Sequence, residues 1–164
     1  MPATLADLMN TLPQAGQVEW LGIRPARGAP MEAMDAVNIV TNGLETDRRV
    51  LAGSRPGKRS VTIIQHEHLA VIASLLGEKT ISPHLLRRNI VVRGINLLAL
   101  KKRAFSIGGA VLRGTDVCAP CSKMETILGD GGYNAMRGHG GICAEVLRPG
   151  KVTIGDAVVA LSAD

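Results

Sequence analysis

Apolar positions in this chain recur mostly in short runs with the spacing of β-strands. The segment 60–64, Ser-Val-Thr-Ile-Ile, is rich in β-branched residues and is typical of a buried strand. Glycine and proline turns separate such runs, and Gly108-Gly109 is typical of a two-residue hairpin. Further strands are predicted at Gln17–Arg24, Met31–Ile39, Asn89–Val92, Ala104–Ile107, Ala110–Arg113, Ile142–Leu147, Lys151–Ile154 and Ala157–Ser162. Roughly eight to nine closely spaced strands predict a mainly β fold, a mixed or antiparallel β-barrel with a few short helices.

Helical spacing occurs in only a few places. In Gln65–Leu76, the apolar residues at 69, 72, 73 and 76 follow the pattern of one helix face. Ser82 and Pro83 are typical of the cap and first position of a short helix. Ser122–Leu128 is predicted to form another, with Glu125 at the offset of a capping box. So few helices disfavour a doubly wound sheet.

The chain is long enough for one domain with its own core. It has 164 residues, and no internal repeat or change of composition divides them. We predict a lead-in segment at residues 1–16 and a barrel domain at residues 17–164. The only aromatic residues are Trp20, Phe105 and Tyr133, so the core must be built mainly from aliphatic side chains.

Hydropathy predicts a cytoplasmic protein, and the distribution of charge is compatible with an anionic ligand. No apolar run reaches the roughly 18 residues that a membrane-spanning helix needs, and the N-terminus lacks the basic region of a signal peptide. We therefore expect reduced thiols and no membrane association. The net charge is +5, and a run of basic residues suits a phosphate, another oxyanion or a nucleic-acid backbone, or simply a solvated surface. Scarce aromatic residues disfavour nucleic acid, because base stacking needs them. The basic run comprises Arg87, Arg88, Arg93, Lys101, Lys102, Arg103 and Arg113.

The segment Cys118-Ala119-Pro120-Cys121 is the strongest candidate for chemistry. It lies between a predicted hairpin and a predicted helix, and helix N-termini lower thiol pKa values. Three interpretations are open. Cys118, Cys121, His139 and Cys143 could bind structural zinc as a Cys₃His set. The two cysteines of the motif could form a redox disulfide, although the βαβ setting of that chemistry is missing. One thiolate could instead act as a nucleophile, as a sulfur carrier or as a ligand of a soft metal.

Among the four histidines, only His139 has a setting that suggests ligand binding. It lies in the loop Gly138–Gly141, where glycines let the backbone approach a ligand closely. His66 and His68 are two residues apart at a helix start and face different directions, and His84 is predicted to be at the surface.

Several segments, in order along the chain, resemble the MOSC domain, the C-terminal module of molybdenum cofactor sulfurases. The family's Gly-Leu-x-Gly-Asp-Arg-His segment resembles residues 43–49, although its second Gly and its His are replaced by Thr46 and Arg49. Its cysteine, which follows a proline, corresponds to Cys121. The other similar segments are Val61–Leu69, Arg88–Val92, Gly138–Ala144 and Gly155-Asp156.

The resemblance implies a barrel-centred fold and a molybdenum-pterin cofactor. Cys121 would be the catalytic residue, as the molybdenum ligand or as a persulfide carrier. The cofactor phosphate would be held by Arg48, Arg88 and Lys101, since guanidinium groups bind phosphate oxygens bidentately. Asn89, His139 and Gly140 would contact other parts of the cofactor.

The resemblance also implies an activity and partners. Family members reduce N-hydroxylated compounds or take part in cofactor sulfuration, so an enzyme is favoured over a carrier. An electron donor or a cofactor-accepting protein would be the partner. Pyridoxal phosphate is not expected, because in the sulfurases it belongs to a separate N-terminal domain. Cys118 is an additional cysteine whose role stays open: a resolving thiol, a second metal ligand or a bystander.

Overall fold

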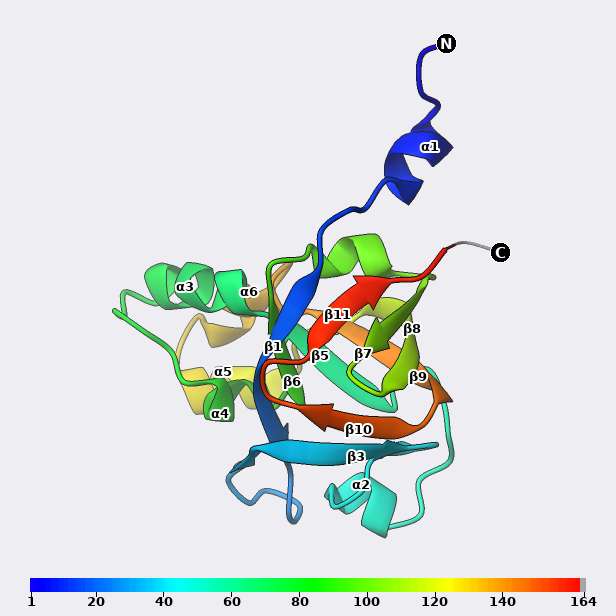
Figure 1. Ribbon diagram of the computed structural model, residues 1–164. Coiled ribbons are helices and arrows are strands. Elements are labelled where there is room, and N and C mark those ends of the chain that lie inside the picture. The colour runs from blue at the N-terminus through cyan, green and yellow to red at the C-terminus, as the bar shows by residue number, and fades with distance from the viewer. Residues whose placement is uncertain (163–164) are drawn as a thin grey trace.

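The computed structural model describes residues 1–162 and is built around a closed β-barrel (Figure 1). Eleven strands occur among the described residues. They are β1 (Gly16–Ile23), β2 (Glu32–Met34), β3 (Ala36–Val40), β4 (Gly43–Leu44), β5 (Val61–Gln65), β6 (Ile90–Arg93), β7 (Ala104–Ile107), β8 (Ala110–Val117), β9 (Ile142–Arg148), β10 (Gly150–Thr153) and β11 (Ala157–Ala160).

Seven of these strands form the barrel, in the order β11-β7-β8-β9-β5-β6-β1. The barrel closes where β1 pairs with β11, with Gly16 opposite Val158. Strands β5 and β6 are parallel, with Ile64 opposite Val91, while the other neighbours in the ring are antiparallel. The predicted mainly β, mixed barrel is therefore confirmed. Strand β2 extends the sheet beyond β1, and β10, β3 and β4 form a second, smaller sheet.

Short helices cover one side of the barrel (Figure 1). Helices α3, α4, α5 and α6 gather there, whereas α1 projects away from the barrel near the N-terminus. Among residues 1–162, no helix combines the length and the apolar character needed to cross a membrane. The helices are α1 (Leu5–Asn10), α2 (Arg48–Leu51), α3 (His66–Leu75), α4 (Pro83–Leu86), α5 (Ser122–Leu128), α6 (Gly132–Met136) and the 3₁₀ helix η1 (Leu97–Leu100).

Two apolar clusters hold the fold together. One fills the barrel and includes Leu21, Ile63 and Phe105, while the other lies under the helices and includes Ile64 and Met136. All five residues of β5 are buried, because alternate side chains face the barrel interior and the covering helices. The sequence of this strand, Val-Thr-Ile-Ile-Gln, therefore lacks a regular alternation of apolar and polar residues.

Three local predictions need correction or addition. Met31–Ile39 is not one strand: the chain changes partner at Asp35, since β2 pairs with β1 and β3 pairs with β10. The predicted lead-in segment contains α1, whose first turn is held by a capping box between Thr4 and Asp7 and whose residues are all exposed. The domain boundary at residue 17 stays a prediction.

Glu125 does not close a capping box on its own helix. The N-cap of α5 is Cys121, and its side chain makes no capping hydrogen bond. The Glu125 carboxylate instead accepts hydrogen bonds from the backbone N–H groups of Gly131 and Tyr133, at 2.7 Å and 2.8 Å. It thereby ties α5 to the start of α6.

Candidate functional site

A small cavity beside the helices is lined by positive charge; we call it the basic pocket. Its volume is about 160 Å³. Among residues 1–162, its lining contains seven cationic side chains, two cysteines and no carboxylate. The lining residues are Arg24, Arg48, Arg49, Arg59, Thr62, Arg87, Arg88, Cys118, Ala119, Cys121, Lys123 and Met124.

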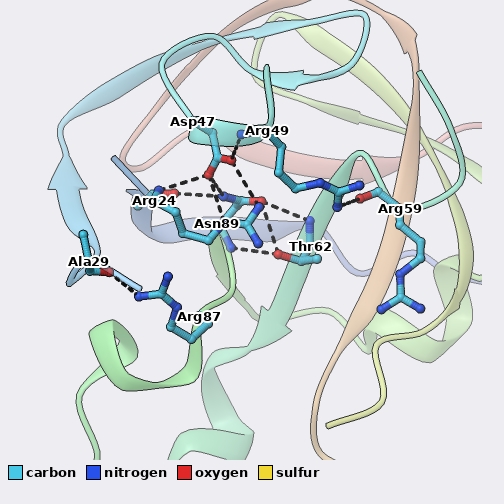
Figure 2. Close-up of polar contacts among 9 residues, drawn as sticks. Arg24, Ala29, Asp47, Arg49, Arg59, Thr62, Arg87 and Asn89 are labelled. Atoms are coloured by element: carbon cyan, nitrogen blue, oxygen red, sulfur yellow. Dashed lines mark hydrogen bonds and ion pairs between the residues drawn. The ribbon is translucent and has the colours of Figure 1, made fainter. Parts of the chain in front are cut away.

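A partly buried ion pair joins Arg24, which lines this pocket, to Asp47, which does not (Figure 2). Asp47 is the N-cap of α2 and accepts a 3.1 Å hydrogen bond from the backbone N–H of Arg49. The Arg24 guanidinium donates to both carboxylate oxygens, at 3.1 Å and 3.3 Å, and its backbone N–H donates at 3.0 Å. Burial opposes ionisation of Asp47, but these bonds and the charge of Arg24 lower its pKa overall. The carboxylate therefore holds the Arg24 side chain and the backbone of Arg49 in place, although Asp47 does not itself line the pocket.

Asn89 extends this network through the barrel wall (Figure 2). Its Nδ2 donates to the carbonyl of Gly22 at 3.1 Å and to Asp47 Oδ2 at 3.3 Å. Its Oδ1 accepts from the backbone N–H and the hydroxyl of Thr62. Asn89 is buried and does not belong to the pocket lining. Its contacts therefore indicate that it positions the arginine-bearing segments.

Other arginines bring positive charge to the pocket without a carboxylate partner among residues 1–162. Arg48 Nε is buried and has no hydrogen-bond partner among them. Arg87 has a left-handed backbone (φ 61°) after α4, and its Nη1 donates to the carbonyl of Ala29 at 2.6 Å. Burial first, and then the charges of Arg24 and Arg48, lower the pKa of Arg87. This crowded positive charge would be relieved by a bound anion.

Arg88 braces the wall of the pocket. Its side chain is buried, and its guanidinium donates to three backbone carbonyls: Nε to Gly140 at 3.0 Å, Nη1 to Leu86 at 3.0 Å and Nη2 to Cys118 at 2.8 Å. A Cβ atom on Gly140 would lie 2.3 Å from the Cys118 carbonyl oxygen, so only glycine fits there without movement. These contacts favour a bracing role for Arg88.

The two cysteines of the motif have different environments. Cys121 is exposed at the pocket, directly before α5, whereas Cys118 and Cys143 are buried. A hydrogen bond from the Cys143 thiol lowers the pKa of Cys118 to about 6, against the effect of burial and with help from Arg88, Arg59 and Arg24. The same hydrogen bond raises the pKa of Cys143, as does burial. Cys118 is therefore a free thiol with a lowered pKa that is hydrogen-bonded to the free thiol of Cys143.

The zinc interpretation of the cysteines is wrong for this structure. Within residues 1–162, no group of three or more His, Cys, Asp and Glu side chains is arranged to hold a metal ion. The reason is geometric. The thiols of Cys118 and Cys143 are hydrogen-bonded to each other in the interior, whereas Cys121 is exposed. The His139 ring packs on His68.

The remaining predicted residues lie outside the basic pocket. Lys101 lines another cavity with Lys102, Arg103 and Arg113, and it pairs with Asp116 at 3.4 Å. Six of the seven residues of the basic run are thus divided between two cavities, and the seventh, Arg93, pairs with Glu19 and lines neither of them. The His139 and His68 ring centroids are 5.1 Å apart, edge to face, and His139 Nδ1 is buried without a partner among the described residues. Gly140 lines a third, apolar cavity on the other side of Cys118.

Four basic residues of the pocket were missed by the sequence reasoning: Arg24, Arg49, Arg59 and Lys123. They come from four separate segments, and nothing in their local sequence joins them. Asp47 did carry a signal, because an Asp directly before a short helix is typical of an N-cap.

Comparison with known proteins agrees with this fold. The family model described as MOSC domain matches residues 47–159. No curated protein matches the sequence. The crystal structure of the YuaD protein from Bacillus subtilis is similar, with a TM-score of 0.76, 24% identity and coverage of 94% of this chain and 100% of that one.

Two further solved structures share the arrangement. YiiM from Escherichia coli has a TM-score of 0.68 and 19% identity, covering 90% of this chain and 71% of its own. YiiM from Geobacillus stearothermophilus has a TM-score of 0.71 and 14% identity, covering 90% and 75%. Likeness at these identities describes the fold.

Proposed function

Because the chain belongs to the MOSC domain family, we propose that its basic pocket binds the molybdenum cofactor and that Cys121 is the thiolate ligand of the metal. One observation carries the proposal: seven cationic side chains and no carboxylate line a cavity that also contains an exposed cysteine. A phosphate-bearing cofactor with a thiolate-binding metal needs this combination of groups.

The residues present fit the phosphate of such a cofactor. Arg48 has a buried, unpartnered Nε at the pocket, which is a donor in need of an acceptor. Arg87 is held with its charge close to those of Arg24 and Arg48. We assign phosphate binding to Arg48 and Arg87, with Arg49 and Arg59 in support. Arg88 positions the wall, while Asn89 and His139 act from outside the lining.

Cys121 has the accessibility that a metal ligand or a sulfur carrier requires. It is exposed, it lines the pocket, and it lies directly before α5 as the N-cap residue of that helix. When bound, the cofactor would supply two-electron redox chemistry or a transferable sulfur atom at the metal. The chain's own part is to hold the phosphate, to present the thiolate and to keep the pocket free of competing carboxylates.

Reduction of N-hydroxylated compounds in the cytoplasm is the activity we propose, with an electron-donor protein as partner. A carrier that passes cofactor or sulfur to an accepting protein is the second candidate, and the exposure of Cys121 favours it, because a persulfide there is accessible to a partner. Turnover of N-hydroxylated substrates with an added electron donor separates the two.

Pterin content tests the phosphate assignment. The protein and its variants are produced in a host that makes the cofactor, and bound pterin is measured by mass spectrometry. The double variant Arg48→Gln with Arg87→Gln is expected to lose most of the pterin. Lys101→Gln with Lys102→Gln is the matched control, because it also removes two charges but from a different cavity, and it is expected to keep the wild-type content. Equal pterin content in the double variant and wild type would refute the assignment.

A further inference from the structure

A second cavity, which we call the apolar pocket, lies against the same Cys118-Ala119 segment. Its volume is about 240 Å³, and Leu97, Leu98, Val117, Pro120 and Tyr133 are in its lining. Leu98, Val117 and Tyr133 are large hydrophobic residues that are 53%, 46% and 41% exposed. Exposed apolar side chains that gather around one cavity are typical of a binding site.

The polar side chains in this lining are those of Gln65, His68, Asn96, Tyr133 and Arg137, and some of their groups are already used within the protein. The Gln65 amide is already used, because its Nε2 donates to the carbonyl of Ile95 at 2.8 Å and its Oε1 accepts from the N–H of Leu97 at 3.0 Å. The His68 ring packs on His139 and forms no hydrogen bond among residues 1–162. Burial, and next the charge of His139, lower the pKa of His68 against the opposing charge of Glu67, which favours the neutral imidazole, and a neutral imidazole offers one donor and one acceptor.

The apolar pocket shares a wall with the basic pocket. Cys118 and Ala119 belong to both linings. Arg88 holds this wall through its hydrogen bonds to the carbonyls of Cys118 and Gly140, and Gly140 lines the apolar side. A molecule in the apolar pocket would therefore be separated from the candidate cofactor site by the Cys118-Ala119 segment.

We propose that the apolar pocket binds a compact, neutral, planar aromatic molecule whose polar edge hydrogen-bonds to His68. The apolar lining takes the ring faces, and the cavity is smaller than the roughly 300 Å³ of typical ligand sites, which limits the body to one or two rings. Arg137 is in the lining and no carboxylate is, so a cationic ring is disfavoured. This site goes beyond the proposed function, and its binding step needs no cofactor.

The single tyrosine of the chain makes a direct test available. Tyr133 lines the pocket, so protein labelled with 3-fluorotyrosine gives one ¹⁹F NMR signal that reports on it. Benzamide is the probe, and we expect a saturable shift of that signal. Benzamidinium has nearly the same shape but carries a positive charge, and it is expected to bind at least tenfold more weakly.

Two variants at exposed positions locate the site. Val117→Asp and Leu98→Asp lie on β8 and η1 and are each expected to weaken benzamide binding at least tenfold. Leu147→Asp is the matched control, because Leu147 is an exposed leucine of β9 outside the lining, and it is expected to bind like wild type. No saturable shift, or wild-type affinity in both pocket variants, would overturn the proposal. Equal binding of benzamidinium would overturn the ligand class.

These outcomes are independent of the cofactor proposal. Benzamide is titrated into protein that carries no molybdenum, so a failure of cofactor binding leaves the result unchanged. Conversely, absent benzamide binding together with normal pterin content would reject only the apolar site.

Discussion

Arg88 donates a 2.8 Å hydrogen bond from Nη2 to the backbone carbonyl of Cys118. This contact joins the segment before β6 to the segment after β8 and fixes the residues that line both the basic pocket and the apolar pocket. Arg88 thus stabilises the local backbone through hydrogen bonds, a role that its charge alone does not suggest.

Replacing Arg88 with lysine is expected to destabilise the fold although it keeps the charge. One ammonium group cannot reproduce the planar set of donors that reaches Gly140, Leu86 and Cys118. We expect a loss of about 2–4 kcal/mol in the free energy of unfolding, because buried carbonyls are left unsatisfied. Denaturant unfolding measures it. Arg93→Lys is the control: Arg93 is exposed and pairs with Glu19, so its loss should stay below about 1 kcal/mol. Similar losses in both variants would contradict the brace.

Substituting Gly140 by alanine tests the same wall sterically. The new Cβ would lie 2.3 Å from the Cys118 carbonyl oxygen and 3.0 Å from Arg88 Nη2. We expect a cost of about 1–3 kcal/mol, typical of overpacking. Gly57→Ala is the matched control, since no atom lies within 4 Å of its added Cβ. Thermal unfolding measures the effect. If both variants unfold at the wild-type midpoint, the backbone around Gly140 accommodates a Cβ atom and the predicted steric cost is wrong.

Cys118 is expected to titrate well below an ordinary thiol. Its pKa is lowered from 9.0 to about 6, so the unfolded chain binds more protons than the folded protein between these values. Stability should therefore rise with pH across that window. Ultraviolet thiolate absorbance should show one transition near pH 6 that Cys118→Ser removes. If the transition persists in Cys118→Ser and disappears in Cys121→Ser, the perturbed thiol is the exposed one.

Asp47 is expected to make the protein acid-sensitive. Its folded pKa is below the ordinary 3.8, so its contribution to stability is present above that value and is lost as the pH falls through the folded pKa. Asp47→Asn should cost about 3–5 kcal/mol at pH 7, because Arg24 is left in a buried site without its partner. Denaturant midpoints between pH 2 and 7 measure both. If wild type and Asp47→Asn lose stability equally as the pH falls, other carboxylates cause the acid sensitivity.

Much of the fold was predictable because its signals are local. Ser122–Leu128 has the predicted bounds of α5, and the Gly108-Gly109 hairpin joins β7 to β8. The short elements without long apolar patterns were missed. Helix α2 has four residues, and α6 is capped by Glu125 from the preceding helix, which no local rule anticipates.

The candidate site was predictable only in part, because it is assembled by the barrel. Arg48 and Cys121 were expected from resemblance to a family, and both line the basic pocket. Arg24 and Arg59 reach it from the end of β1 and the segment before β5, so only the closed barrel brings them together. Lys101 looked equivalent to them by charge but lies at another cavity.

The molybdenum content of Cys121→Ser tests the central claim most directly. Wild type, Cys121→Ser and Cys118→Ser are produced in a cofactor-making host, and molybdenum per chain is measured by mass spectrometry, with circular dichroism as the check of folding. We predict that wild type contains molybdenum, that folded Cys121→Ser has lost most of it, and that Cys118→Ser retains it. Equal molybdenum in wild type and Cys121→Ser, or none in wild type, would contradict the assignment of Cys121 as the metal ligand.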